Sequence, residues 1–115
     1  MEPNCPFCKI IRLETDTKIL YQDEFVTAFP DAHPIAPVHV LVVSNRHILS
    51  TNQLELEDEQ VVGRMVRVAA RMAFEMGVSV SGYRLVYNCG PDAGQSVAHL
   101  HLHMIGGRHL PFRFE

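Results

Sequence analysis

The sequence lacks the features that mark large, membrane-bound or polymer-binding proteins. Its 115 residues leave room for one small domain, and no internal repeat, low-complexity segment or linker divides them. No apolar run approaches the roughly 18 residues that span a bilayer, and the N-terminus lacks a basic and then apolar leader. A net charge of −3 argues against binding to a nucleic-acid polymer, which requires clustered Lys and Arg. We therefore expect a cytoplasmic, single-domain protein over residues 1–115, without a membrane or nucleic-acid partner.

Cysteine is also scarce, with 3 in the chain, but two of them form a Cys5-x-x-Cys8 pair. A disulfide is not expected, because no secretory leader indicates an oxidising compartment. A thioredoxin-like redox pair should follow a strand, and nothing precedes Cys5 that could be that strand. The third interpretation is half of a structural zinc site, whose two further ligands the spacing does not identify. Cys89 matches no motif, and we expect it to be a small buried or half-buried residue.

Short segments with the period of strands surround one long segment with the period of a helix. The β-prone runs cover residues 18–22, 25–29, 38–43, 82–88 and 97–105. The long helix lies within residues 50–77, where a stripe of apolar residues recurs at steps of three and four: Met65, Val68, Ala69, Met72, Ala73 and Met76. A short helix is expected over residues 5–12, and a proline-rich loop over 30–37. Because no βαβαβ alternation occurs, the pattern predicts an α+β fold with an antiparallel sheet.

Histidine is the residue in surplus, with seven against three tyrosines and no tryptophan. His99, His101 and His103 alternate with apolar residues, so on a strand they would share one face in a row roughly 13 Å long. Such a row is compatible with a solvated polar face, with a catalytic zinc site built on His-x-His, or with nucleophilic catalysis by an imidazole. The spacing alone does not separate the last two.

The loop before these histidines favours an anionic ligand. Gly90 and Gly94 permit backbone conformations in which N–H groups converge on an anion, and Gln95 and Ser96 add side-chain donors. The loop lacks the Gly-Lys-Ser/Thr ending of a P-loop. An anion-binding loop beside a neutral imidazole suits attack on a phosphorus atom.

Residues 94–103 resemble the defining pattern of the histidine triad (HIT) superfamily, His-x-His-x-His followed by apolar residues. The resemblance covers nearly the whole chain, through residues 7–11, 28–31, 36–39, 45–47, 82–84 and Asn88. The ending Gly106-Gly107-Arg108 is similar to the Hint branch of that superfamily. The resemblance implies a HIT-like fold, a five-stranded antiparallel sheet with one long and one short helix. It also implies a homodimer whose sheet continues across the interface.

The activity implied by the resemblance is hydrolysis at the α-phosphate of purine nucleoside 5′-phosphoramidates. In such proteins the middle histidine, here His101, attacks phosphorus and forms a nucleotidyl-histidine intermediate that water then hydrolyses. The catalytic set carried over is His101, His103, Ser96 and His39. The substrate-binding set is Asp31 at the ribose hydroxyls, with Asn88, Gly94, Gln95, Ser96, Val97 and His103 around the phosphate. No catalytic metal is required.

The resemblance also supplies the missing zinc ligands. Many bacterial HIT proteins with this N-terminal pair bind a structural zinc through Cys5 and Cys8 and through the histidines that match His47 and His99. The remaining histidines, His33 and His109, are expected at the surface rather than in a site.

Two alternatives stay open. One is a diadenosine polyphosphate hydrolase of the Fhit branch, which usually carries a longer C-terminal extension; the other is a nucleotide-binding module without turnover. A uridylyltransferase would carry Gln at the position of His103. Three residues depart from the usual Hint pattern: Ala98 replaces a common aromatic, Ser44 a usual proline, and Phe112 lies near a frequent Trp.

Overall fold

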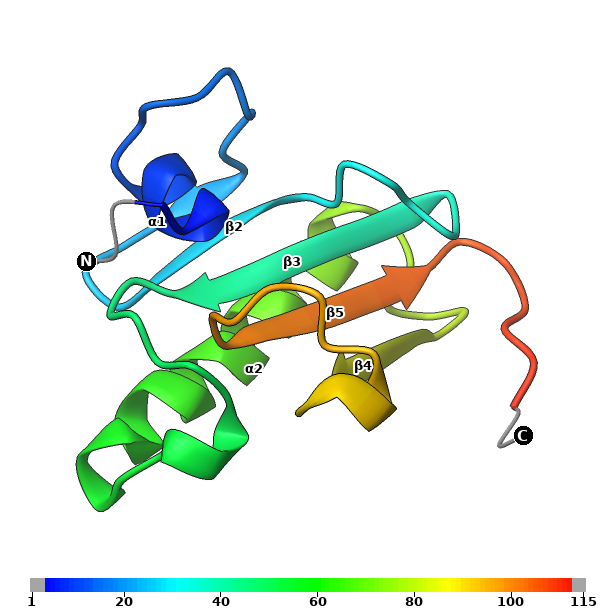
Figure 1. The fold of residues 1–115 in the computed structure, drawn as a ribbon. Coiled ribbons are helices and arrows are strands. Elements are labelled where there is room, and N and C mark those ends of the chain that lie inside the picture. The colour runs from blue at the N-terminus through cyan, green and yellow to red at the C-terminus, as the bar shows by residue number, and fades with distance from the viewer. Residues whose placement is uncertain (1–3, 113–115) are drawn as a thin grey trace.

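A five-stranded antiparallel sheet forms the centre of the molecule in the computed structural model, which describes residues 4–112 (Figure 1). The strand order is β1-β2-β3-β5-β4. The strands are β1 (Tyr21–Gln22), β2 (Val26–Pro30), β3 (Val38–Ser44), β4 (Tyr83–Tyr87) and β5 (His101–Gly106). The helices are α1 (Pro6–Ile11) and α2 (Glu59–Glu75), with 3-10 turns at Thr51–Gln53, Leu56–Asp58 and Pro91–Ala93. The predicted α+β class with one long and one short helix is confirmed.

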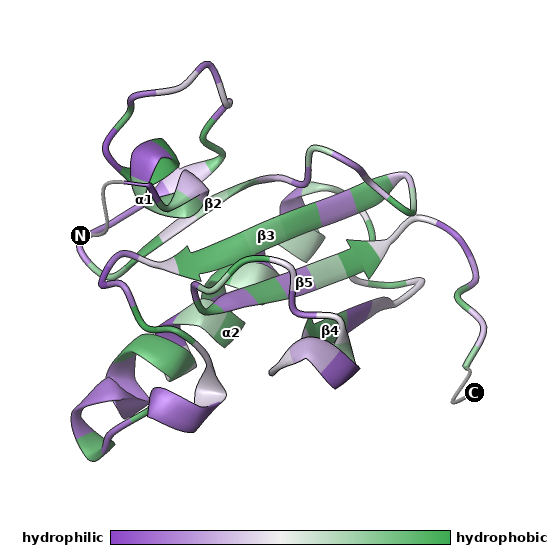
Figure 2. Ribbon diagram, in the orientation of Figure 1, coloured by the Kyte–Doolittle hydropathy of each residue, from purple (hydrophilic) through white to green (hydrophobic). Residues whose placement is uncertain are grey.

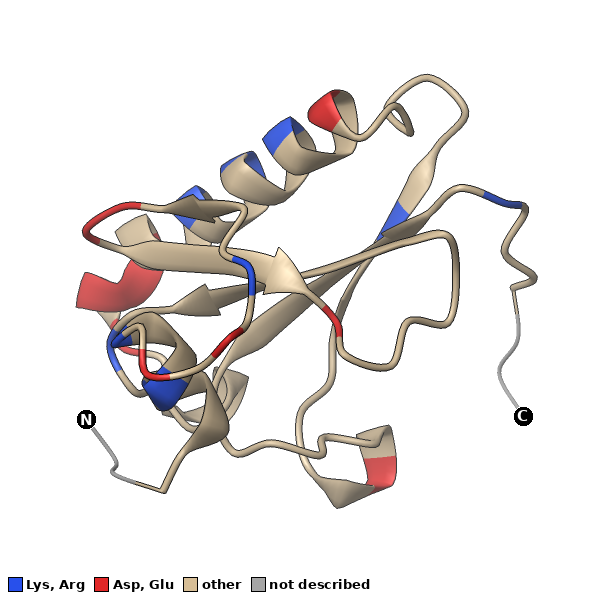
Figure 3. Cartoon of the chain, turned by 90° about the horizontal axis from the view of Figure 1, so that it is seen from above, with Lys and Arg blue, Asp and Glu red and all other residues tan. Residues whose placement is uncertain are grey.

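The long helix α2 covers one face of the sheet. Its buried residues are Met65, Val68, Ala69, Met72 and Ala73, and they pack against alternate residues of the strands such as Val42, Leu102 and Met104. Met76 was expected in the same stripe but is 40% exposed, because it lies at the C-terminal end of the helix, where Gly77 at φ +79° ends the turn. Basic residues recur along α2 (Figure 3), where Arg64 pairs with Asp23 and Arg71 with Glu75.

The short helix α1 packs on the opposite face of the sheet. Phe7, Cys8 and Ile11 are buried there against Phe29, Leu41 and Val43. β3 is therefore covered on both faces and reads as an almost continuous hydrophobic strand (Figure 2). Within residues 4–112 no helix is long and apolar enough to cross a membrane.

The register of the central pair decides which face carries the histidines. β3 pairs with β5 so that Val43 lies opposite His101, Leu41 opposite His103 and His39 opposite Ile105. Residues paired across an antiparallel ladder share a face, so His39, His101 and His103 all lie on the α1 side of the sheet. The face expected from the alternation is thus the one observed.

The last strand begins four residues later than the period-two pattern suggested, at His101 rather than residue 97. His99 lies in a bend before the strand, where its N–H donates to the carbonyl of Val97, and the next N–H, of Leu100, donates to Ile48. The expectation of three histidines in one straight row on a strand is wrong for His99. The bend frees that side chain to turn toward α1.

Candidate active site and metal-binding cluster

Four side chains from three separate parts of the chain converge beside α1. Cys5 is the N-cap residue of α1 and Cys8 lies in its first turn, so the helix itself brings the two thiols together; the Cys8 N–H donates to Sγ of Cys5. His47 follows β3 and His99 precedes β5. Sγ of Cys5 lies 3.3 Å from Nδ1 of His99, and Sγ of Cys8 lies 3.2 Å from Nδ1 of His47. All four donor atoms lie within 4.8 Å of one another.

The chemistry and spacing of this cluster fit a tetrahedral zinc ion. With Zn–S near 2.3 Å and Zn–N near 2.0–2.1 Å, sulfur and nitrogen ligands of one ion should be about 3.5 Å apart. The observed sulfur–nitrogen distances of 3.2–3.6 Å match that spacing. Nε2 of His99 lies 2.7 Å from the carbonyl of Ser44 and donates to it, which leaves the Nδ1 lone pair facing the thiols. Burial lowers the pKa of His99 to about 4, so this imidazole is neutral at pH 7.

A second set of histidines, on β3 and β5, is joined by hydrogen bonds. The Ile35 N–H donates to Nδ1 of His39, 3.3 Å away, so the proton of neutral His39 is on Nε2. Nε2 of His39 lies 2.9 Å from Nδ1 of His103 and donates to it, which places the proton of His103 on its own Nε2. The chain of donors therefore ends in an N–H on the far side of the His103 ring.

His101 has the opposite tautomer. Its Nδ1 lies 2.6 Å from the carbonyl of His99 and donates to it, so the lone pair is on Nε2. Its ring packs edge-on against Phe7 and against His103, with centroids 5.0 and 5.1 Å apart respectively. A nucleophilic nitrogen on His101 thus lies beside a histidine that can donate a hydrogen bond.

Burial keeps His39 and His103 uncharged. It lowers the pKa of His103 to about 4 and also lowers the pKa of His39, for which the carboxylate of Asp31, 3.4 Å away, acts in the opposite direction. Both imidazoles are therefore neutral at pH 7, as the donor–acceptor chain requires.

The second set is poorly suited to a metal ion, although donor atoms of Asp31, His39 and His103 also lie within 4.8 Å of one another. Two imidazole nitrogens on one tetrahedral ion should be about 3.3 Å apart. The nitrogens of His39 and His103 are 2.9 Å apart, which is a hydrogen-bond distance. His99 and His101 do not share an ion either, because Nδ1 of His99 faces the cysteines while Nδ1 of His101 faces a backbone carbonyl.

A pocket of about 370 Å³ opens onto His101 and His103. Of the residues expected to bind substrate, the structure places Asp31, Ser96, Val97 and His103 in its wall, together with His101. The volume lies in the range of small-molecule sites. His39 is buried behind His103 and does not line the pocket.

Three residues expected near the phosphate do not line this pocket: Asn88, Gly94 and Gln95. The Asn88 amide donates to the carbonyl of Ala93. The Gln95 side chain accepts from the Gly90 N–H and donates to the carbonyls of Leu49 and Val97. In this structure Asn88 and Gln95 therefore brace the glycine loop, and their contact with a substrate stays a prediction.

Sequence reasoning missed the apolar wall of the pocket, formed by Phe7, Ile10, Phe29 and Leu41. Phe7 and Phe29 pack edge to face, with ring centroids 5.5 Å apart. Phe7 and Ile10 show the helical spacing of α1, but that spacing does not distinguish a core face from a ligand wall. His33, expected only at the surface, is exposed and also lines this pocket.

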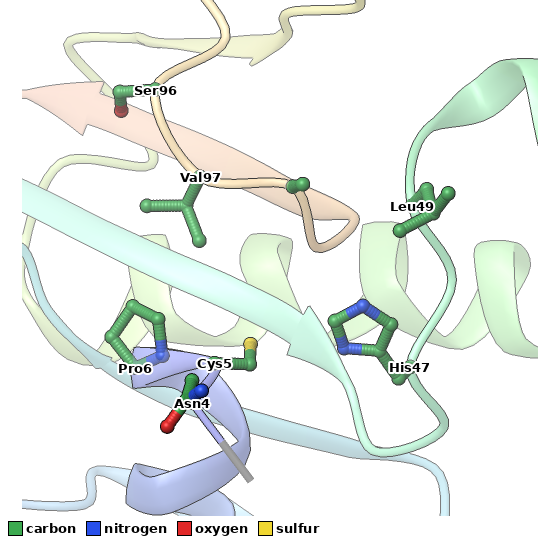
Figure 4. Close-up of a pocket in the computed structure, with 8 residues that line it drawn as sticks. Asn4, Cys5, Pro6, His47, Leu49, Ser96 and Val97 are labelled. Carbon is green, nitrogen blue, oxygen red and sulfur yellow. The ribbon is translucent and has the colours of Figure 1, made fainter. Parts of the chain in front are cut away.

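A second pocket, of about 400 Å³, lies beside the cysteine–histidine cluster (Figure 4). Cys5 and His47 line it, and Ser96 and Val97 are shared with the first pocket. Ala98, at the position where an aromatic is common in the Hint pattern, also lines it, so a small side chain leaves this space open.

Comparisons with known proteins agree with these features. A model of the HIT domain family matches residues 12–110. The purine nucleoside phosphoramidase of Escherichia coli (strain K12) is 47% identical over 104 residues, which are 90% of this chain and 87% of that protein. A HIT family hydrolase from Clostridium thermocellum has a similar structure, with a TM-score of 0.96 at 39% identity over all of both chains. A histidine triad protein from Clostridium difficile has a TM-score of 0.94 at 37% identity, covering 99% of each chain.

Proposed function

The chain belongs to the HIT domain family, and from that premise we propose that it is a nucleotide hydrolase acting at the α-phosphate of purine nucleoside 5′-phosphoramidates. The observation that carries this proposal is the pair of opposite tautomers at the pocket. His101 presents a lone pair, and His103, beside it, presents an N–H. A lone pair beside a donor is the arrangement that attack on a phosphoryl group needs, because charge develops on the phosphate oxygens as the nucleophile approaches.

The reaction takes two displacements at phosphorus. In the first, Nε2 of His101 forms a bond to phosphorus and the P–N bond breaks, so that the leaving nitrogen takes up a proton from solvent and departs as an amine. In the second, water attacks phosphorus and gives up a proton to solvent, the bond to His101 breaks with its electron pair returning to Nε2, and the nucleoside monophosphate leaves. Nε2–H of His103 donates to the phosphate oxygens, and Ser96 at the pocket wall donates a hydrogen bond on the leaving-group side. Because the Nδ1 proton of His101 is donated to the His99 carbonyl, the lone pair on Nε2 is available for attack without a strong base.

The rest of the pocket suits the nucleoside. The aromatic and aliphatic wall takes the flat purine, and the carboxylate of Asp31 accepts from the ribose hydroxyls. One oxygen of Asp31 already accepts from the His33 N–H, 2.8 Å away, which fixes the carboxylate at the edge of the pocket.

We further propose that Cys5, Cys8, His47 and His99 hold a structural zinc. When bound, the ion joins α1 to the segment before β5 and takes no part in the displacement. Phe7, between the two cysteines in sequence, packs against both His99 and His101, with ring centroids 5.8 and 5.0 Å apart. Fixing α1 therefore also fixes one wall of the pocket and the ring of the nucleophile.

A homodimer completes the proposal. β4 lies at the edge of the sheet, where unpaired N–H and C=O groups can extend the ladder into a second copy. Large apolar side chains on β4 and α2 are also open to solvent, with Leu85 37%, Val66 41% and Phe74 74% exposed. We expect light scattering to give a mass of twice 13.0 kDa at micromolar concentration. A monomer mass at all concentrations measured would refute the dimer and leave the proposed reaction unaffected.

The activity is tested by incubating the protein with an adenosine phosphoramidate, with diadenosine tetraphosphate and with AMP alone. Rapid release of AMP from the P–N substrate, with little cleavage of the dinucleotide, is the expected result. Preferred cleavage of the dinucleotide would favour the Fhit-type reaction instead. Tight AMP binding with no turnover of either substrate would show a binding module and overturn the proposal.

A further inference from the structure

Gly107 and Arg108, which follow β5, lie directly against the proline loop over residues 30–37. Gly107 has φ +94°, and a Cβ built on it would lie 2.9 Å from Cβ of Pro37 and 3.3 Å from the backbone nitrogen of Val38. Any other residue there would push the loop away. The two segments, far apart in sequence, are therefore in close backbone contact.

Arg108 adds a polar link at the same place. One guanidinium nitrogen donates to the carbonyl of Ile35 at 3.0 Å, and another donates to the carbonyl of His109 at 2.9 Å. The Ile35 side chain is 61% exposed and contributes little packing. The position of the Ile35 backbone therefore depends on its hydrogen bonds: Arg108 on the C=O and His39 on the N–H.

The Ile35 N–H is the group that sets the tautomer of His39. Its bond to Nδ1 places the His39 proton on Nε2, and that proton is donated to His103. Without the Ile35 N–H, Nδ1 of His39 is free to carry a proton. His39 would then also populate the other tautomer, in which Nε2 offers His103 a lone pair in place of a proton.

We infer that Arg108 is a positioning residue for the reaction: by holding the Ile35 carbonyl, it keeps the Ile35 N–H on His39 and so fixes the proton arrangement of His39 and His103. The kinetic part of this inference rests on the proposed function, whereas the tautomer part does not. The inference also gives the Gly106-Gly107-Arg108 motif a structural role. Gly107 allows the backbone to lie close to the proline loop, and Arg108 then hydrogen-bonds to that loop.

The surroundings of His39 give the direction of the pH effect. The titratable groups that face it are Asp31, from the end of β2, and His103, from β5, with His101 next along that strand. The Ile35 N–H stabilises neutral His39 by bonding to its lone pair. Losing this bond favours the protonated ring, especially with the Asp31 carboxylate nearby, so the acid limb of the activity profile should move to higher pH.

Four variants separate this role from a general loss of structure. Arg108→Gln removes the guanidinium, and Arg108→Lys keeps a cationic donor for the Ile35 carbonyl. Arg84→Gln is the matched control, because Arg84 donates to the carbonyls of Leu110 and Pro111 in the same tail rather than to the proline loop. Ile35→Pro removes the N–H itself and leaves Arg108 in place.

The measurements are the ring-nitrogen NMR shifts of His39 and His103, the pH profile of kcat/KM, and kcat and KM separately. In Arg108→Gln and in Ile35→Pro we expect mixed His39 tautomers, an acid limb at higher pH, and a kcat lowered about tenfold with KM nearly unchanged. Arg108→Lys should recover most of kcat, and Arg84→Gln should match the wild type. A single wild-type tautomer and an unshifted pH profile in Arg108→Gln would overturn the inference.

Failure of the proposed function can be distinguished from failure of this inference. If the wild-type protein turns over no phosphoramidate, the kinetic measurements give no result, but the NMR shifts still report the His39 tautomer in every variant. If Arg108→Gln is too unstable to study, Arg108→Met, which keeps the aliphatic stem but has no donor, takes its place: a wild-type tautomer in Arg108→Met or in Ile35→Pro contradicts the inference.

Discussion

The two histidine sets both draw on the segment from His99 to His103, yet their nitrogens are arranged in different ways. In the set at His47 and His99, the Nδ1 atoms and two thiols point toward one common centre. In the set at His39, His101 and His103, hydrogen bonds run from the Ile35 N–H through His39 to His103, and Nδ1 of His101 donates to a backbone carbonyl. Converging lone pairs suit a cation, whereas alternating donors and acceptors fix protons. The residue type alone therefore does not decide the chemistry; the direction of the nitrogens does.

His99 connects the two sets. Its side chain belongs to the cysteine cluster, while its backbone carbonyl accepts from Nδ1 of His101 and so sets the tautomer of the proposed nucleophile. A metal that fixes His99 also fixes the partner of His101. Substitutions in the first set should therefore also shift the side chains of the second set, whereas substitutions in the second set should leave the metal bound.

The largest effect is expected from His101→Ala. Removing the nucleophile should lower turnover of an adenosine phosphoramidate by about 10⁴-fold or more. The zinc content per chain should stay unchanged, because His101 is not among the four converging side chains. The assay is AMP release, with metal analysis and a thermal melt on the same sample. Near-normal turnover in this variant would end the assignment of His101.

Cys8→Ala is expected to break the first set. Cys8 is fully buried and its Sγ lies near both His47 and His99, so its loss removes a ligand at the centre of the cluster. We expect zinc content to fall well below one per chain and the melting temperature to fall by about 10 °C.

The matched control is Cys89→Ala, a half-buried cysteine outside the cluster. It should retain the metal and most of the stability. Two results would contradict the zinc proposal. One is an absence of zinc in protein purified without a His-tag, and the other is a melting temperature of Cys8→Ala equal to that of Cys89→Ala.

The smallest effect is a dependence of stability on pH that originates in the second set. His103 has a pKa of about 4 in the folded protein, below the value near 6.5 of an unfolded histidine. Between these values the unfolded chain binds more protons, so the free energy of unfolding should fall as the pH is lowered from about 6.5 toward 4. Urea titrations at several pH values measure the slope, and His103→Gln should make it shallower. An unchanged slope in that variant would show that His103 does not titrate as its burial indicates.

The sequence predicted the fold class, the face of the sheet that carries the histidines, and the buried side of α2, because each rests on a simple period of apolar residues. It did not predict where β5 begins. The alternation continues through His99, but the Leu100 N–H bonds to Ile48, and His99 turns toward α1. Such a bend depends on a contact with a distant segment, which the local pattern does not contain.

The candidate site, like the fold, was predictable from the sequence only in part. The Cys5-x-x-Cys8 spacing favoured half of a zinc site among three interpretations, and the partners His47 and His99 followed only from the family resemblance. The apolar wall at Phe7 and Phe29 was missed, because a residue that lines a pocket has the same period as one that fills a core. The tautomers of His39 and His101 depend on backbone groups at Ile35 and His99, whose positions only the folded chain defines.

The central claim is that the lone pair of His101 attacks phosphorus. It is tested most directly by mixing the protein with an adenosine phosphoramidate, quenching within the first turnovers and mapping the modified peptide by mass spectrometry. The account predicts an adenylyl group on His101, present in the wild type, absent in His101→Ala and present in Cys89→Ala. An adenylyl group on another residue, or rapid turnover in which no adduct forms at any time, would contradict it.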